Sequence, residues 1–194
     1  MKNQTPLSSY QWLVVAILAF TQFTVVLDFM VMSPLGDLLM KDLQVKPYQF
    51  GIVVSSYALA AGLSGFLTAG FADRFDRKHL LVFFYSGFII GTLFCGLAQS
   101  YEQLVMARIF TGIFGGVMSS ISMAIVADLF ALQQRGRVMG FMQMGFGLSQ
   151  ILGIPISLYI AAQSNWQMPF YMIVVLSLTM LVLILFGLKP VRAH

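Results

Sequence analysis

Six long apolar stretches, each bounded by charged or turn-forming residues, decide what this chain can fold into. Their approximate limits are residues 11–33, 49–71, 80–99, 104–126, 138–160 and 168–188. A helix needs about 20 apolar residues to cross the hydrocarbon core of a bilayer. The chain has 194 residues, so six such helices and their connections fill nearly all of it. We therefore expect an all-α, polytopic membrane protein that forms a single six-helix bundle over residues 1–194.

The composition agrees with this interpretation. Hydrophobic residues make up 59% of the chain and charged residues 9%, whereas a soluble domain carries about 25% charged residues. A water-soluble globule would need more polar surface than this chain has, which excludes most soluble enzymes and DNA-binding domains. The single cysteine, Cys95, excludes an internal disulfide and a cysteine-based zinc site. We expect no metal and no other cofactor.

The basic residues predict how the bundle is oriented. Eight of the eleven Lys and Arg residues fall on one side of the membrane: Lys2, Arg74, Arg77, Lys78, Arg135, Arg137, Lys189 and Arg192. The other side carries Lys41 and Lys46, and Arg108 lies within a span. Because cytoplasmic loops carry the excess of positive charge, both termini are expected in the cytoplasm. This bias also explains the basic composition without nucleic acid binding.

Three of the spans carry polar side chains at helical spacing. Each of three sets shares a helix face: Thr21, Thr24 and Asp28; Arg108, Thr111 and Ser119; Gln143 and Gln150. Lipid would penalise these faces, so we expect them to converge on an aqueous cavity. Hydrogen bonding between helices would explain the serines and threonines alone. The two glutamines and the two charges favour the cavity.

Asp28 and Arg108 are the charged residues inside the spans. Each lies a few residues from the outer end of its span, so their depths in the membrane are similar. A charge at the bilayer centre costs at least about 2.5–3.5 kcal/mol, which makes an ion pair the natural arrangement. Desolvation offsets most of the attraction in a buried pair, so a purely stabilising role is a weak explanation. We expect Asp28 to load and release a proton as the cavity opens to either side.

The second span differs from the others in its row of small residues, which includes Gly51, Gly62 and Gly65. Small residues let a neighbouring helix approach closely, so we expect a partner helix against this face. The sequence leaves open whether the partner belongs to the same chain. The sixth span is apolar on all sides and is expected to face lipid. The third is nearly as apolar, but its small residues Gly87, Gly91 and Cys95 lie four apart and suit close helix contact.

Several motifs resemble those of the major facilitator superfamily (MFS). GFADRFDRK, residues 70–78, is similar to the family's loop signature G-x-L-A-D-R-x-G-R-R/K, with Asp76 in place of the second glycine. ARIFTGIFGG resembles the fourth-helix motif through Arg108, Gly112 and Gly116. VVLDFMVMSPLG resembles the first-helix motif of proton-coupled efflux members, and MGFGLSQILGIP partly matches the fifth-helix antiporter motif at Gly145, Gly153 and Pro155. The combination looks most like bacterial drug or sugar efflux permeases.

This resemblance implies a fold, a function and roles for the matched residues. The fold would be the N-terminal half of an MFS transporter, with six helices in two three-helix inverted repeats. The function would be proton-coupled efflux of a small organic molecule across the inner membrane by alternating access. A cytoplasmic charge cluster would latch the two halves in the outward-open state; its motif residues are Gly70, Asp73, Arg74, Arg77, Lys78 and Asp128.

The length raises the main question about function. Family members have twelve helices, with the substrate between two six-helix halves, and this chain ends at LKPVRAH, where the linker to a second half is expected. Transport would then need a second half, supplied by another copy, a separate chain or a longer gene. The alternatives are a homodimeric half-transporter and a non-transporting truncated half or excised fragment.

An intramembrane enzyme is not supported by the sequence. A rhomboid-like protease needs a histidine within the membrane, but His79 and His194 both lie outside the predicted spans. An aspartyl protease needs two membrane carboxylates and only Asp28 qualifies, while an HExxH zinc motif is absent from the sequence. We therefore expect a transporter and not an enzyme.

Overall fold

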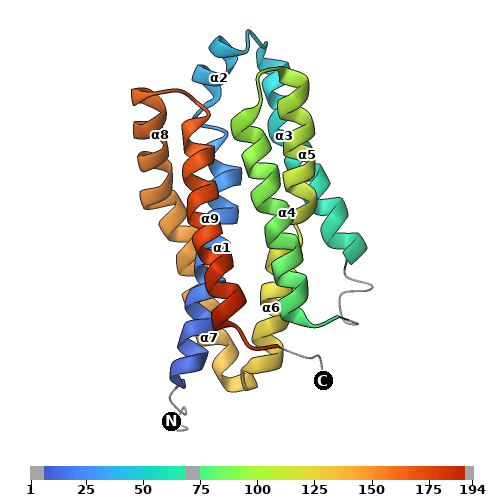
Figure 1. Cartoon of the computed structure of the whole chain (residues 1–194), viewed down its shortest axis with the longest axis vertical. Coiled ribbons are helices and arrows are strands. Elements are labelled where there is room, and N and C mark those ends of the chain that lie inside the picture. Colours follow the sequence, from blue (N-terminus) through green and yellow to red (C-terminus); the bar gives the residue numbers. More distant parts are fainter. Residues whose placement is uncertain (1–6, 69–74, 191–194) are drawn as a thin grey trace.

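The computed structural model describes residues 7–68 and 75–190, and all regular elements within these ranges are helices (Figure 1). Within these ranges, six spans are long and apolar enough to cross a membrane. Four of them are single helices: α1 (Ser9–Val31), α3 (Pro47–Thr68), α4 (Arg77–Leu97) and α9 (Met168–Gly187). The short helix α2 (Gly36–Asp42) joins α1 to α3. The predicted all-α polytopic fold is confirmed.

The other two spans are interrupted inside the membrane. The fourth consists of α5 (Tyr101–Gly115) and α6 (Met118–Leu129), which meet at a pair of glycines with low helix propensity. The fifth consists of α7 (Leu132–Leu148), the π-helical turn η2 (Ser149–Gly153) and α8 (Ile154–Gln163). Pro155 follows this turn; its ring would clash with the carbonyl four residues earlier in a regular helix, and that carbonyl belongs to η2. The π turn therefore accommodates the proline.

The helix limits differ most from the sequence prediction in the fifth span, which begins at Leu132 instead of near residue 138. Its first turn is polar, so hydropathy alone places it outside the membrane. Arg135 in this turn donates from Nε to the carbonyl of Phe130 at 3.0 Å and from Nη2 to that of Ala127 at 2.6 Å. The basic side chain thereby satisfies carbonyls at the C-terminus of α6, and this contact orders the turn as a helix.

The packing shows two three-helix inverted repeats. Exchanging the first three spans with the last three preserves the main contacts: α3 packs on α5 as α7 packs on α1, and α4 packs on α5 as α9 packs on α1. The third and sixth spans, α4 and α9, pack on each other. Successive spans alternate in direction, so α1 and α5 run oppositely through the bundle (Figure 1). The exchange therefore relates two units of inverted topology.

Helix α1 begins and helix α9 ends at the same end of the bundle (Figure 1), where the backbone N–H of Lys189 donates to the hydroxyl of Tyr10 at 3.1 Å. We call this the N/C end and the opposite one the far end. Helix α4 is as deeply buried as α1, and its Gly87 and Gly91 lie against Phe114 and Thr111 of α5, in agreement with the close helix contact expected for the third span. Tyr85, Phe88 and Thr92 of α4 are all fully enclosed. Uniform apolarity cannot separate contact with lipid from contact with neighbouring helices, because the two surroundings are equally apolar.

Candidate functional site

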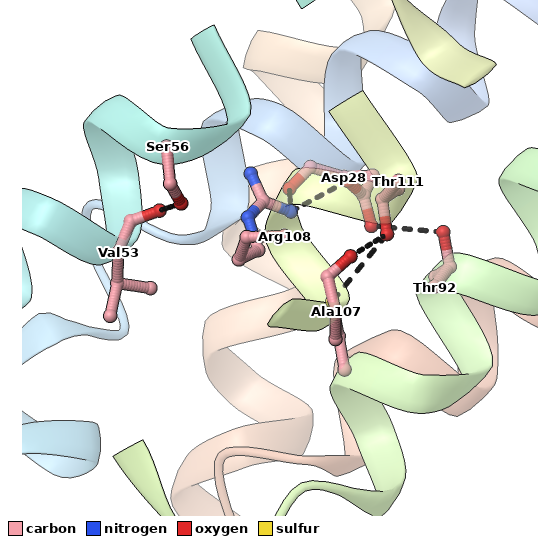
Figure 2. Close-up of polar contacts among 8 residues, drawn as sticks. Asp28, Val53, Ser56, Thr92, Ala107, Arg108 and Thr111 are labelled. Carbon is pink, nitrogen blue, oxygen red and sulfur yellow. Dashed lines mark hydrogen bonds and ion pairs between the residues drawn. The ribbon is translucent and has the colours of Figure 1, made fainter. Parts of the chain in front are cut away.

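Asp28 and Arg108 form an ion pair inside the bundle (Figure 2). Nη1 of Arg108 donates to Oδ2 of Asp28 at 2.8 Å and also lies 3.4 Å from the main-chain oxygen of Asp28. Both side chains have 0% solvent exposure. Asp28 lies near the end of α1 and Arg108 in the first half of α5, so the structure brings together the two intramembrane charges that the sequence pairs.

Two further side chains contact the pair from neighbouring helices. Thr92 of α4 donates from Oγ1 to Oδ1 of Asp28 at 3.1 Å. The guanidinium carbon of Arg108 lies 4.4 Å from the ring centroid of Tyr57 on α3, a cation–π arrangement. Neither residue is predicted from the sequence. Thr92 is a lone hydroxyl in an apolar span, and Tyr57 lies in the helix that was singled out for its small residues. The one sequence signal for both is their depth in the membrane, which is similar to that of Asp28.

Three of the residues predicted to line a cavity are instead buried between helices. Thr21 donates to the carbonyl of Ile17 at 2.9 Å, and Thr111 donates to that of Ala107 at 2.7 Å. Thr24 shares a hydrogen bond of 2.8 Å with the hydroxyl of Tyr85. All three threonines are at most 1% exposed. In this six-helix bundle their hydroxyls satisfy polar groups within the protein, which is the packing role that the sequence left open.

The other predicted cavity residues lie at the surface. Ser119 is exposed and donates to Oε1 of Gln22 at 3.3 Å. Gln143 is exposed on α7, and Gln150 is half-buried in the π turn η2. None of these three side chains has a hydrogen bond to Asp28 or Arg108 among the described contacts. The predicted set thus separates into a buried layer near the ion pair and an exposed group.

A second charged contact lies at the N/C end, in the predicted latch. Nε of Arg77, at the start of α4, is 3.1 Å from Oδ2 of Asp128, near the end of α6. Lys78 donates from Nζ to the carbonyl of Leu185 in the last turn of α9 at 2.8 Å, a favourable position for a cation. Gly70, Asp73 and Arg74 lie outside the described residues. The described part of the motif, Arg77, Lys78 and Asp128, therefore connects the start of α4 to the ends of α6 and α9.

Asp76, which replaces a glycine of the family signature, acts as the N-cap of α4. Its φ and ψ are −60° and 128°, an extended conformation that does not require glycine. The carboxylate accepts hydrogen bonds from the backbone N–H groups of Lys78 at 2.9 Å and His79 at 3.2 Å. The substitution thus supplies partners for backbone donors that the first turn of a helix leaves unpaired.

The predicted packing residues fall into two groups. A Cβ added at Gly112 would lie 2.5 Å from the carbonyl oxygen of Tyr57, and one at Gly116 would overlap the backbone of Ala61, so α5 touches α3 closely. A Cβ at Gly153 would lie 2.6 Å from Leu27, and one at Gly65 would lie 3.7 Å from the oxygen of Gly116. By contrast, the described residues leave open space around the Cβ positions of Gly51 and Gly62. Part of the small-residue row of α3 therefore faces outward.

Six spans in inverted repeats, enclosing a charged pair, are the architecture of one half of a polytopic secondary-transporter fold. Residues 18–194 match the sequence profile of the Major Facilitator Superfamily. The chain belongs to this family.

The most informative relatives are bacterial. The chain is 29% identical over 171 residues to the uncharacterized MFS-type transporter YceJ of Bacillus subtilis (strain 168), which covers 87% of this chain and 44% of YceJ. It is 33% identical over 123 residues to multidrug resistance protein 3 of the same organism, covering 63% of this chain and 24% of that protein. The chain thus spans less than half the length of these relatives.

Two solved structures share the fold. One is a bacterial homologue of the human lysosomal transporter Spinster, inward-facing and occupied, with a TM-score of 0.83 and 17% identity over 97% of this chain and 46% of that chain. The other is the proton:xylose symporter XylE bound to 6-bromo-6-deoxy-D-glucose, with a TM-score of 0.81 and 20% identity over 91% of this chain and 44% of that chain. In both cases the likeness covers about half of the solved protein.

Proposed function

We propose that this chain is the N-terminal half of a secondary transporter that exports a small organic molecule, drug-like or sugar-like, in exchange for protons. The observation that carries the proposal is the fully buried pair of Asp28 and Arg108. Such a pair gains little stability over apolar residues of similar size, so a role in ion coupling is the better explanation for its presence. The multidrug resistance protein among the relatives supports an export role, and the XylE structure belongs to a proton-coupled protein of the same fold.

The geometry suggests how a proton would act. Protonation of Asp28 removes the charge that balances Arg108, and an unpaired guanidinium at 0% exposure is strongly unfavourable. The protonated state is therefore stable only in a conformation that gives Arg108 another partner or water. The pair links α1 to α5, so this requirement couples proton binding to the relative position of two helices. Proton binding would then shift the population of molecules towards that conformation, as any ligand does that binds one of two conformations more tightly.

A second six-helix half is part of this proposal. Helices α3 and the α7–α8 span are the least buried of the six spans. Leu59, Leu63 and Phe66 of α3 are 66% to 83% exposed, beside the open positions at Gly51 and Gly62. We propose that another copy of the chain or a separate chain packs on these faces. The protein would lie in an inner membrane, with both termini on the cytoplasmic side. The Arg77–Asp128 contact would then hold the cytoplasmic end closed until the transporter changes state.

The test uses everted membrane vesicles from cells that express the chain, with an imposed proton gradient and a pH-sensitive dye. A panel of cationic dyes and neutral sugars is added, and an exported compound is expected to dissipate the gradient. Asp28→Asn should abolish this response, whereas Asp37→Asn, a control in the exposed part of α2, should keep it. An unchanged response in Asp28→Asn would exclude Asp28 as the proton site. A lack of response to every compound, with or without a second half, would favour the non-transporting alternative.

A further inference from the structure

Arg137, in the second turn of α7, carries an exposed guanidinium that rests on two aromatic rings. Its guanidinium carbon lies 5.8 Å from the ring centroid of Trp12 on α1 and 5.8 Å from that of Phe141 on α7. These two rings pack edge to face, with 4.9 Å between their centroids. Arg135 donates to two carbonyls, whereas the described residues accept no hydrogen bond from Arg137. The rings therefore position a cation whose N–H groups are open to a ligand.

An apolar groove begins at the same two rings. It has a volume of about 500 Å³ and lies between α1 and the α7–η2–α8 span, within the size range of sites that bind small molecules. Trp12 and Phe141 line the end next to Arg137. Phe20 and Phe23 line the groove farther along α1, and Phe23 lies about 16 Å beyond Trp12 along the helix axis. The groove is therefore long enough for a ring system whose end reaches the guanidinium.

The combination of a cation and aromatic walls selects the ligand. An arginine stacked on rings keeps its in-plane N–H groups open, and their fork matches the two oxygens of a carboxylate. None of the described residues that line the groove is acidic, so a cationic ligand would lack a counter-charge there. The rings favour an aromatic body, because pairs of aromatic groups gain more than the burial of their area. The site thus fits a flat organic acid better than a sugar or a cationic dye.

The groove is compatible with a second half and with exchange for protons. In Figure 1, α1 stands between α3 and α8, which belong to the two least buried spans. A second half that rests on these flanking helices faces α1 across the groove, so a ligand there lies between the halves, where transporters with such repeats hold substrates. Asp28 lies about 24 Å beyond Trp12 along α1. The anion and the proton therefore occupy separate sites, and neither has to move with the other.

We propose that Arg137 binds the carboxylate of a small aromatic acid whose rings lie in the groove between α1 and α7, and that this acid is exported. The inference rests on the proposed function and names a substrate class for it. In the proposed orientation the N/C end faces the cytoplasm, so the guanidinium stands where the acid enters. The apolar groove supplies most of the affinity. Arg137 orients the acid, because an exposed ion pair contributes little by itself.

The test measures binding of 2-naphthoate to the purified chain in nanodiscs of zwitterionic lipid by calorimetry, with the heat for empty nanodiscs subtracted. 2-Naphthamide, which has the same rings and no charge, is the matched ligand. We expect naphthoate to bind about fivefold or more tightly than naphthamide, because only the carboxylate forms a charge-assisted, bidentate pair with Arg137. Naphthamide should still bind measurably, since its rings leave water for the groove.

Two pairs of variants separate the charge from the groove. Arg137→Gln should lower naphthoate affinity about fivefold or more and leave naphthamide affinity unchanged. Lys189→Gln is the matched control, because Lys189 is also a cation over an aromatic ring, Tyr10, at the N/C end, and it should change neither affinity. Ala16→Phe fills part of the groove and should weaken both ligands at least about tenfold. Val175→Phe, on the exposed face of α9, should weaken neither. The comparison of the two ligands on the wild-type chain depends on no variant.

Four outcomes would overturn the inference: equal binding of the two ligands, equal losses in Arg137→Gln and Lys189→Gln, no naphthoate binding to the folded wild-type chain, or loss of both ligands in nanodiscs that contain phosphatidylglycerol. The last would show that a lipid occupies the groove in place of a substrate. If naphthoate does not bind while Asp28→Asn abolishes proton-coupled flux of another compound, the proposed function stands without this substrate class. If naphthoate binds as expected and Asp28→Asn leaves flux unchanged, the acid site stands and Asp28 is not the proton site.

Discussion

Trp166 donates its indole N–H to Oδ2 of Asp42 at 2.7 Å, which ties the connection between α1 and α3 to the connection between α8 and α9. The bond lies at the far end of the bundle, and Trp166 is only 2% exposed. Its ring also packs edge-on against Phe170 at the start of α9, with 6.2 Å between centroids. One buried side chain therefore holds together the far ends of the first and last spans.

We expect Trp166→Phe to lower the free energy of unfolding by about 0.5–1.5 kcal/mol, because it removes the hydrogen bond to Asp42, whose exposed carboxylate can bind water instead. The measurement is unfolding of the purified chain in mixed micelles, followed by circular dichroism. Trp12→Phe is the matched control, since Trp12 is 39% exposed, and it should cost much less. Equal losses in the two variants would show that the hydrogen bond to Asp42 contributes little.

The close contact between α5 and α3 predicts contrasting effects for two glycines. Gly112→Ala would place a Cβ 2.5 Å from the carbonyl oxygen of Tyr57, so the helices must separate. We expect a loss of about 1–3 kcal/mol, as for other overpacked cores. Gly62→Ala points into open space and should leave stability unchanged or slightly raised. A melting temperature that falls equally in both variants would contradict the assigned packing.

Asp76 allows a test of the helix cap that replaces the family's glycine. Asp76→Ala removes the acceptor for the N–H groups of Lys78 and His79 and should cost about 0.5–2 kcal/mol. Asp76→Gly, which restores the family residue, should reduce stability less than the alanine variant, because glycine is itself acceptable at an N-cap. Denaturant unfolding of both variants gives the comparison; the opposite order would argue against capping as the role of Asp76.

The ion pair predicts strong non-additivity between its two residues. Asp28→Ala should destabilise the chain by about 3–5 kcal/mol, because it leaves Arg108 buried without a counter-charge. The double variant Asp28→Leu with Arg108→Met should be much closer to the wild type in stability, since paired charges are replaced by apolar groups. Proton-coupled flux should be lost in both. A double variant as unstable as the single one would show that the pair itself stabilises the fold.

The six spans and the pairing of Asp28 with Arg108 could be predicted from sequence, because membrane burial penalises charge so strongly. The surroundings of the pair could not. Thr92 and Tyr57 are ordinary residues in apolar helices, and their roles depend on helix rotation, which hydropathy does not encode. The same ambiguity affected Thr21, Thr24 and Thr111: a hydroxyl can satisfy its own helix or face water, and only the packing of neighbouring helices decides which.

The row of small residues on α3 predicts where a second half would contact this one. In a background with Cys95→Ser, Gly62→Cys presents a thiol on the open face, whereas Gly65→Cys lies beside Gly116 of α5 and serves as the control. If another copy of the chain supplies the second half, oxidation of native membranes should produce a disulfide-linked dimer of Gly62→Cys and little or none of Gly65→Cys. Gel mobility with and without reducing agent measures this. No dimer of Gly62→Cys, or equal dimers of both variants, would argue against pairing of two copies through α3 and would favour a separate chain as the partner.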